Sequence, residues 1–337
     1  MARSITETLN DLNIATQEYT KELVRVVSED NVVCKRMLGK SESVDGGDYI
    51  KVPLRYGKEQ FGSMAEYDSI SLQPKDILDE ARYNWSHING NVSISEETMK
   101  VKNAGRRKLL NLVKVRTMNL ADTFKDGMSD MLFAEASNQA STDPDSLHDI
   151  CATTNPIGGI THSATLGYTW NPTQIAPAGT PTFANLIDPT SDHYIMKILR
   201  NAVGQLTIGS DKPTLILTTQ PVWDAYEQVL ADLKRMGQSY SGDSGFDVLK
   251  FRHVDVVVDN HVQGGKLDAN SNARSFMYVL NEDFIGFYHS AGFNFQSAPW
   301  KRAEMQHVYF TELDWYGGLG VSRRDMQGSV SNLPVGY

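Results

Sequence analysis

Two short stretches, residues 50–56 and 81–85, alternate apolar and polar side chains on either side of a long polar interval. A period of two residues is typical of strands with one covered face, so these stretches predict a long β-hairpin with a wide tip. Pro53 lacks a backbone donor, which favours an edge or exposed position for the first strand. Because a two-stranded hairpin is only marginally stable in water, we expect a neighbouring chain to complete it.

Apolar and aromatic side chains are scattered along this hairpin and its tip. Side chains of this kind on an extended arm suggest contact with another copy of the chain. The candidate residues of that subunit interface are Tyr56, Lys58, Phe61, Met64 and Tyr67.

Length and composition describe a folded protein of more than one lobe. The 337 residues are about twice a typical domain of roughly 100–200 residues. Hydrophobic residues make up 40% and charged residues 22%, which argues against disorder. The net charge of −9 argues against a dedicated nucleic-acid binder, whose surface would be basic, but it is compatible with a protein that surrounds DNA without gripping it.

The cysteines and the apolar segments exclude several other classes. Cys34 and Cys151 lie far apart and form no CxxC pair, so neither a disulfide framework nor a zinc site is supported. We expect two idle thiols in a reducing cytoplasm. The first residues lack the apolar segment of a signal peptide, and no run of about 18 apolar residues follows, so we expect no membrane partner.

The remaining segments differ in pattern. Residues 4–38 are expected to form a polar, amphipathic helical arm, and residues 94–138 a long spine helix or a helix that breaks near Gly105. The Pro- and Gly-rich residues 139–190 are typical of a junction between lobes. Strand and helix patterns alternate over 191–262, which predicts a compact α/β lobe. Strand patterns return over 275–324, and the tail from 327 is expected to be disordered or exchanged between chains.

Five stretches follow one another in an order that a known family shares. They are 147–171 with its Gly158-Gly159-Ile160-Thr161 and Trp170, LILTTQPVWDAY at 215–226, FRHVDVVVD at 251–259, FMYVLN at 276–281 and WYGGLGV at 315–321. In pattern and order they resemble the major capsid proteins of tailed double-stranded DNA bacteriophages, whose fold is shared with encapsulins and the herpesvirus capsid floor. The resemblance covers about residues 40–331.

This resemblance implies an α+β tailed-phage capsid fold with five parts. Its parts would be an N-terminal arm over 1–43, an extended β-hairpin loop over 44–90, a peripheral lobe with spine helix and junction over 91–190, an axial α/β lobe over 191–274, and closing peripheral strands with the tail over 275–337. In such proteins the hairpin lies over the adjacent subunit.

The resemblance also implies the function and the partners. The chain would be a structural subunit, not an enzyme, that assembles with itself as pentamers and hexamers around packaged double-stranded DNA. A portal is a further expected partner, and a separate scaffold protein or a cleaved precursor is expected because no long charged pro-region precedes residue 40. Its expected location is the virion, after assembly in the host cytoplasm, and no cofactor or metal is expected. Some relatives join a loop Lys to a neighbour's Asn; Lys58 lies in the matching loop, but nothing identifies its partner.

Several motifs suggest other chemistry and are interpreted as local structure. Gly242-Asp243-Ser244-Gly245 matches the nucleophile motif of chymotrypsin-like proteases, but the upstream His and Asp segments are missing, which favours a mobile loop. Glu96-Glu97 favours a helix start. The group Asp143, Asp145, His148 and Asp149 lacks the spacing of a Ca²⁺ loop and favours turn and cap roles. The basic doublets at 106–107, 234–235, 301–302 and 323–324 are interpreted as solvated faces, salt bridges between subunits or weak contacts with packaged DNA.

Two alternatives stay open. An encapsulin-type compartment has the same fold and predicts a cargo enzyme inside the particles, although the long N-terminal arm favours a phage shell. A serine hydrolase that uses the loop 239–245 predicts labelling of Ser244 by a serine-reactive probe.

Overall fold

The computed structural model describes residues 32–55, 61–64, 78–98, 106–153, 155–161, 170–177, 179, 181–232, 240–241, 247–268, 270 and 272–336. Within these ranges, no helix combines the length and the apolar character that crossing a membrane requires.

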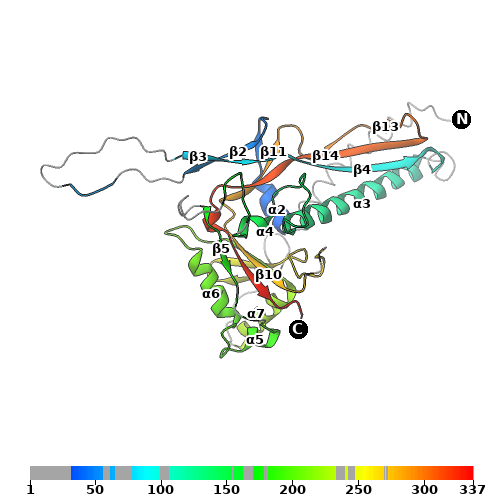
Figure 1. Cartoon of the computed structure of the whole chain (residues 1–337). Helices are drawn as coiled ribbons and strands as arrows, with labels where there is room; N and C mark the ends of the chain where they lie inside the picture. Colours follow the sequence, from blue (N-terminus) through cyan, green and yellow to red (C-terminus); the bar gives the residue numbers. More distant parts are fainter. Residues whose placement is uncertain are drawn as a thin grey trace.

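The described residues form two sheets and a projecting hairpin (Figure 1). A long six-stranded sheet lies at the top of the view, and a seven-stranded sheet with its helices lies below it. A separate two-stranded sheet extends sideways from the long sheet. The expected α+β class is therefore confirmed.

The hairpin consists of β2 (Ile50–Arg55) and β3 (Leu78–Tyr83). The two strands pair antiparallel over their full length. The three apolar residues of β2 are buried and the residues between them are exposed, as the period of two predicts. The predicted hairpin is therefore confirmed at its base.

The long sheet is organised around β14 (Val308–Val321). One edge of β14 pairs with all ten residues of β4 (Ser86–Ser95), and its other edge pairs in turn with β13, β12 and β11. β1 adds to β11 in parallel at the edge of the sheet. These shorter strands are β1 (Glu42–Val44), β11 (Ile285–Ser290), β12 (Gln296–Ser297) and β13 (Lys301–Arg302).

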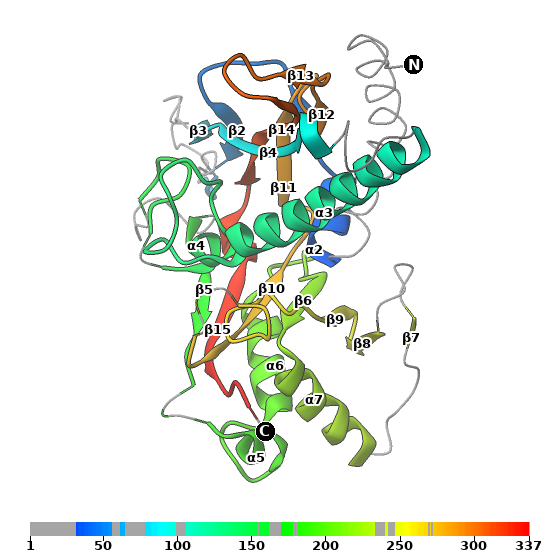
Figure 2. The same ribbon diagram turned by 90° about the vertical axis from the view of Figure 1, so that its right-hand side faces the viewer.

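The spine helix is α3 (Arg106–Phe133), which runs beside the long sheet on the side of the second sheet (Figure 2). Val113, Phe124 and Met128 form the buried stripe that their helical spacing predicts. The helix ends at Phe133, before the predicted end at residue 138. Residues 99–105 lie outside the described residues, so the predicted break near Gly105 stays a prediction.

Helical residues begin at 96, directly after β4, and the Ser95 hydroxyl accepts the Thr98 amide at 3.2 Å, so the predicted helix start at Ser95-Glu96-Glu97 is confirmed. Strand β4 itself was not predicted. Its apolar residues alternate correctly, but Gly90 occupies one inward position and interrupts the hydrophobic pattern. A Cβ on Gly90 would lie 2.7 Å from Cε2 of Phe124 and 2.8 Å from Cδ1 of Leu120. Glycine at position 90 therefore lets α3 approach the strand. Because it has no apolar side chain, it interrupts the alternation of apolar and polar residues from which a strand is predicted.

The second sheet has the strand order β5-β15-β10-β6-β9-β8-β7. Helices α5 (Phe183–Ile187), α6 (Ile195–Gln205) and α7 (Gln220–Asp232) complete this part of the molecule (Figure 2). The strands are β5 (Thr173–Ile175), β6 (Leu215–Thr218), β7 (Tyr240–Ser241), β8 (Asp247–Phe251), β9 (Val254–Val258), β10 (Ser275–Leu280) and β15 (Gly328–Leu333).

Both faces of this sheet are covered. Met277 and Val279 of β10 pack into the cluster formed with α6 and α7, whereas Tyr278 and Leu280 pack into the main core with residues of α3 and the long sheet. All four residues of β6 are buried for the same reason. A strand with two covered faces reads as a continuous apolar run, which is how this strand was predicted.

The end of the chain differs from the prediction. β10 and β15 were assigned to the closing strands of the peripheral sheet, but both belong to the seven-stranded sheet. The tail from residue 327 was expected to be disordered or exchanged, yet β15 pairs with β10 and β5 of the same chain. Val330 and Leu333 are fully buried there, and this apolar burial offsets the entropy of ordering the tail.

Three short helices connect these parts: α2 (Val32–Gly39), α4 (Leu147–Cys151) and the 3₁₀ helix η4 (Arg324–Met326). α2 buries Val33 and Met37, which lie one turn apart. The rest of the predicted helical arm, before residue 32, lies outside the described residues.

Candidate assembly surfaces

Of the predicted interface residues, Phe61 and Met64 lie in the part of the chain that the structure describes. Phe61 is 101% exposed and Met64 is 52% exposed. The segment 61–64 lies beyond the β2–β3 ladder, away from both sheets (Figure 1). Tyr56, Lys58 and Tyr67 lie outside the described residues, so their part in an interface stays a prediction.

The base of the hairpin is fixed to the body of the protein. The Tyr83 hydroxyl donates to the Val321 carbonyl at 2.9 Å and accepts from the Val321 amide at 3.2 Å. On the other side, the Arg82 amide donates to the Gly158 carbonyl at 2.9 Å. Burial raises the pKa of Tyr83 well above its usual range, so the hydroxyl keeps its proton and its donor role. The base is therefore a rigid mount from which the tip extends.

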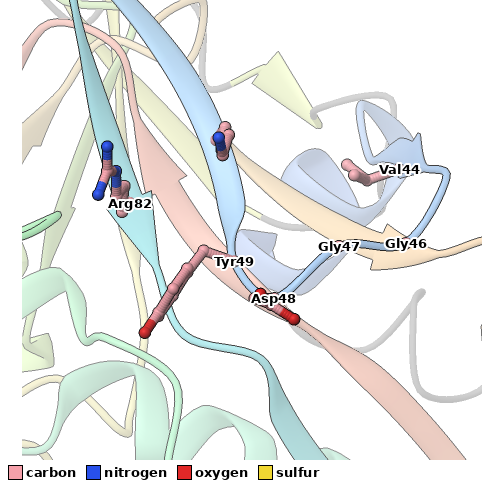
Figure 3. Close-up of a pocket in the computed structure, with 7 residues that line it drawn as sticks. Val44, Gly46, Gly47, Asp48, Tyr49 and Arg82 are labelled. Carbon is pink, nitrogen blue, oxygen red and sulfur yellow. The ribbon is translucent and has the colours of Figure 1, made fainter.

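A shallow hollow of about 580 Å³ lies at this base (Figure 3). It is lined by Val44, Gly46, Gly47, Asp48, Tyr49, Lys51 and Arg82. The two cations are already paired, since Glu80 lies 2.6 Å from Nη2 of Arg82 and 3.5 Å from Nζ of Lys51. Both cations at the hollow are thus engaged in ion pairs within the hairpin.

The opposite end of the long sheet also carries exposed apolar groups. Met305, in the turn between β13 and β14, is 98% exposed. Glu96 holds this turn because its carboxylate lies 3.0 Å from Nδ1 of His307 and 3.4 Å from Nη2 of Arg302. Glu96 thus ties the end of β4 to the β13–β14 turn.

A fully buried arginine joins the lobe junction to the end of β14. Arg324 donates from Nε to the Ile150 carbonyl at 2.8 Å and from Nη2 to the carbonyls of Asp149 and Ala152. These carbonyls belong to the C-terminal end of α4, where a cation is favoured by the helix dipole. The interpretation of the 323–324 doublet as a solvated face or a contact between subunits is therefore wrong for Arg324.

The other doublets have different outcomes. Arg323 pairs within the chain with Asp211 and Asp325 at 2.8 and 3.0 Å. Lys301 and Arg302 are exposed, as predicted for a solvated face. The side chains of Arg106 and Arg107 and the whole of 234–235 lie outside the description, and so does Ser244 of the protease-like motif.

Asp145 sits beside this arginine in a cavity of about 310 Å³ between the hairpin base, the 136–145 loop and β14. Burial and the neighbouring Asp149 raise the pKa of Asp145 to about 6, against a lowering by Arg324. Turn and cap roles hold for its neighbours: Asp143 accepts the Ala140 amide at 2.9 Å, and Ser146 caps α4 through the Asp149 amide. Among the described residues, no group of His, Cys, Asp or Glu has the arrangement of a metal site.

The raised pKa predicts a pH-dependent stability. The folded protein holds this proton above pH 4 while the unfolded chain has released it, so the free energy of unfolding falls as pH rises from about 4 to 6 and is flat above. Asp145→Asn should remove that slope and stabilise the subunit at pH 7 by about 1–3 kcal/mol. Urea unfolding at pH 4.5, 6 and 8 measures both effects. Asp143→Asn is the control and should keep the slope; parallel slopes in parent and Asp145→Asn would contradict the assignment.

A second contact holds the α/β part against the spine helix. His261, which is 8% exposed, places Nδ1 2.8 Å from Asp130 and Nε2 3.8 Å from Asp126, both on α3. Gln263 donates to the Phe133 carbonyl at 3.0 Å from the same loop. Cys151 is buried in the main core, and burial raises the pKa of its thiol to about 12, in agreement with an idle thiol.

The sequence predicted the projecting hairpin but not the residues that fix its base to the body of the protein. Tyr83 was identified only as part of the alternating stretch 81–85, and His261 belongs to none of the motifs that the sequence analysis singled out. Their partners lie more than 100 positions away in the sequence, at Val321 and Asp130. A single sequence has no local signal for such pairs.

Comparisons with known proteins give a match in structure and none in sequence. No protein-family model matches the chain, and no curated protein matches it. The capsid asymmetric unit of cyanophage A-1(L) is 13% identical with a TM-score of 0.57, over 89% of this chain and 92% of that chain. The holo-SrpI encapsulin complex from Synechococcus elongatus PCC 7942 is 12% identical with a TM-score of 0.55, over 90% and 89%. The structure of Mycobacterium phage Ogopogo is 13% identical with a TM-score of 0.53, over 90% and 92%.

These likenesses extend over nearly the whole chain. The chain has the fold of the tailed-phage major capsid proteins, which encapsulins share.

Proposed function

We propose that this protein is the structural shell subunit of an icosahedral phage head. The observation that carries the proposal is the whole-chain likeness to phage capsid and encapsulin shell structures, about 90% of each chain, rather than to one domain of a larger enzyme. The mechanism is assembly. Copies bury hairpins and lobe faces on their neighbours, so stability belongs to the lattice more than to the single subunit.

The projecting hairpin is the proposed main contact between subunits. Exposed apolar groups such as Phe61 and Met64 gain burial only against another molecule, because the segment lies beyond the body of its own chain. Tyr56, Lys58 and Tyr67 would belong to the same contact. In this proposal, residues 44–90 form the extended loop, the long sheet and α3 form the peripheral lobe, and the seven-stranded sheet forms the axial lobe.

A closed shell requires copies of the subunit as partners, together with proteins that guide its assembly. Heterologous contacts that close by rotation give rings, here pentamers and hexamers. A scaffold protein and a portal would guide assembly in the host cytoplasm, and the finished virion would hold double-stranded DNA against the inner face. In this proposal the subunit has no catalytic role, and Glu96, Asp145 and His261 serve structure.

An encapsulin-type compartment is the second candidate, because an encapsulin is among the structures of similar fold. It differs in content: its particles would enclose a cargo protein and no DNA. Nuclease treatment of purified particles, followed by extraction and by gels for DNA and for a second protein, separates the two.

Negative-stain electron microscopy of the purified full chain tests the shell function itself. We expect closed particles or rings of five and six subunits, with sedimentation to match. A protein that stays a monomer at high concentration, alone and with extracts of an infected host, would contradict the proposal. Labelling of Ser244 by a serine-reactive probe would instead favour the hydrolase alternative.

A further inference from the structure

Two segments of the chain cross side by side between the two sheets. Residues 281–284 lead from β10 of the seven-stranded sheet to β11 of the long sheet, and residues 322–327 lead from β14 back to β15. The Ser322 amide donates to the Phe284 carbonyl at 2.8 Å and so joins the two segments near one end. We call these two paired segments the joint.

A buried glutamine joins the two segments at the other end of the joint. The Gln327 side chain accepts the Asn281 amide at Oε1 and donates from Nε2 to the Asn281 carbonyl, both at 3.0 Å. Gln327 is fully buried and Asn281 is nearly so. Because this reciprocal pair of bonds copies one rung of an antiparallel ladder, we expect the two segments to behave as one unit.

Helix α2 lies at this joint, where the two sheets meet (Figure 1). Arg36 places Nη2 2.6 Å from Oδ2 of Asp255 on β9 and Nη1 3.4 Å from Oε2 of Glu282 in the joint. Lys40, which directly follows the helix, places Nζ 3.1 Å from Oδ1 of Asp283, also in the joint. The chain then continues into β1, which pairs with β11 of the long sheet. α2 therefore links the seven-stranded sheet to the long sheet across the joint.

α2 is too short to persist without its contacts. It has eight residues, and isolated helices shorter than about 12–15 residues are marginal in water. Val33 and Met37 bury their side chains in the main core, whereas Gly39 and Lys40 are exposed. The docking of α2 therefore combines a small apolar contact with the ion pairs of Arg36 and Lys40.

A cavity of about 510 Å³ adjoins the ion pairs of Arg36. Its lining includes Arg36, Asp255 and Glu282 together with Thr214 and Lys250. Lys250 lies 3.7 Å from Asp255, and the Thr214 hydroxyl donates to Glu282 at 2.9 Å, so each acid keeps a partner when Arg36 leaves. The side chains of Arg36 and Asp255 are 26% and 22% exposed, so dissolved ions can screen this pair.

We propose that α2 is a strap that ion pairs hold across the joint and that salt releases. At low salt, Arg36 bonds the helix to β9 and to the joint. When these pairs are screened or Arg36 is removed, α2 detaches more often. The joint then opens more often as well, because α2 no longer links the two sheets across it. This inference concerns the single subunit, so its failure leaves the proposed shell function untouched.

Hydrogen exchange of the full chain, followed by mass spectrometry, tests the strap. In Arg36→Met, the amides of residues 32–39 and 281–284 should exchange about three- to tenfold faster than in the parent at low salt. Lys35→Met is the matched control, because it removes the same charge from the same helix and Lys35 makes none of the ion pairs described above. This control should exchange as the parent does. Peptides from α7 should be unchanged in both variants, which reports that the fold is intact.

A salt series on the parent makes the same test without a substitution. Between about 0.01 M and 1 M NaCl the Debye length falls from about 30 Å to about 3 Å. Exchange of residues 32–39 in the parent should therefore rise towards that of Arg36→Met, with peptides from α7 as the reference. Arg36→Met should respond less to salt than the parent, because the ion pairs of Arg36 are already gone.

Several results would overturn the inference. Equal exchange of residues 32–39 in Arg36→Met and in the parent would show that apolar packing alone holds α2. Equal acceleration in Lys35→Met would assign the effect to the net charge of the helix. Faster exchange of residues 32–39 with unchanged exchange of 281–284 would show that α2 leaves without loosening the joint. If Arg36→Met does not fold, the salt series decides, and unchanged exchange across that series refutes the strap.

Discussion

Removal of residues 57–73 is expected to leave a folded subunit that forms no closed shells. The buried part of the hairpin lies at its base, where Tyr83 bonds to Val321 and the apolar residues of β2 enter the main core. The described residues inside the deleted segment, 61–64, are all exposed. The deletion therefore removes no core contact that is seen in the single chain, and the unfolding midpoint should change little.

Assembly should respond strongly, because every copy loses its projecting arm. Burial of two side chains such as Phe61 and Met64 is worth about 3–6 kcal/mol per contact, or roughly a hundred- to ten-thousandfold in affinity. In a shell, that loss is repeated at every subunit. The protein concentration at which particles appear should therefore rise above the concentrations that purified protein can reach.

Circular dichroism and urea unfolding measure the fold, and electron microscopy with sedimentation measures the particles. The double variant Phe61→Ser with Met64→Ser keeps the loop length and should weaken assembly in the same direction. Leu267→Ser, at a 52% exposed site after β9, is the matched control and should assemble normally. Normal shells from the deletion would show that the hairpin is not a main contact.

The hairpin was predictable because its signal is local. Three apolar residues of β2 alternate with exposed ones, and one covered face is enough to determine that pattern. Helices α6 and α7 and strand β6 were predictable for a similar reason. Apolar residues at helical spacing indicate a helix with one buried face, and a continuous apolar run indicates a strand with two buried faces.

Other parts depend on partners far away in the sequence. Strand β4 is hidden by Gly90, whose role is to admit Phe124 and Leu120 of the spine helix. Strand β15 looked like a tail because its apolar residues are few, and only its pairing with β10 and β5 explains their burial. Arg324 was interpreted as half of a surface doublet, because the residues next to it in the sequence do not indicate that it donates to three backbone carbonyls.

Arg324→Met is expected to produce the largest loss of subunit stability of any single change discussed here, about 2–4 kcal/mol. Met fills much of the same space but donates nothing, so the carbonyls of Asp149, Ile150 and Ala152 lose this donor in a buried place. The change also removes the positive charge of Arg324, which opposes the rise in the pKa of Asp145.

Two opposing effects make the comparison informative. Burial lowers the pKa of Arg324, which reflects the cost of taking its charge out of water, and Met removes that cost. The loss should nevertheless dominate, because a thioether offers no donor to the carbonyls of Ile150 and Ala152, whereas the Asp149 carbonyl keeps the Ala152 amide at 3.2 Å. Arg324→Lys should recover part of the stability, since it keeps the charge but cannot span all three acceptors.

Urea unfolding of the unassembled subunit measures the effect, with Arg323→Met as the neighbouring control. Arg323 keeps 26% of its side chain exposed and pairs with Asp211 and Asp325, so its loss should cost only about 1 kcal/mol. An equal or smaller loss for Arg324→Met would mean that the desolvation of its charge cancels its hydrogen bonds. In that case apolar packing alone would hold α4 against the end of β14, where Val321 binds Tyr83 at the base of the hairpin.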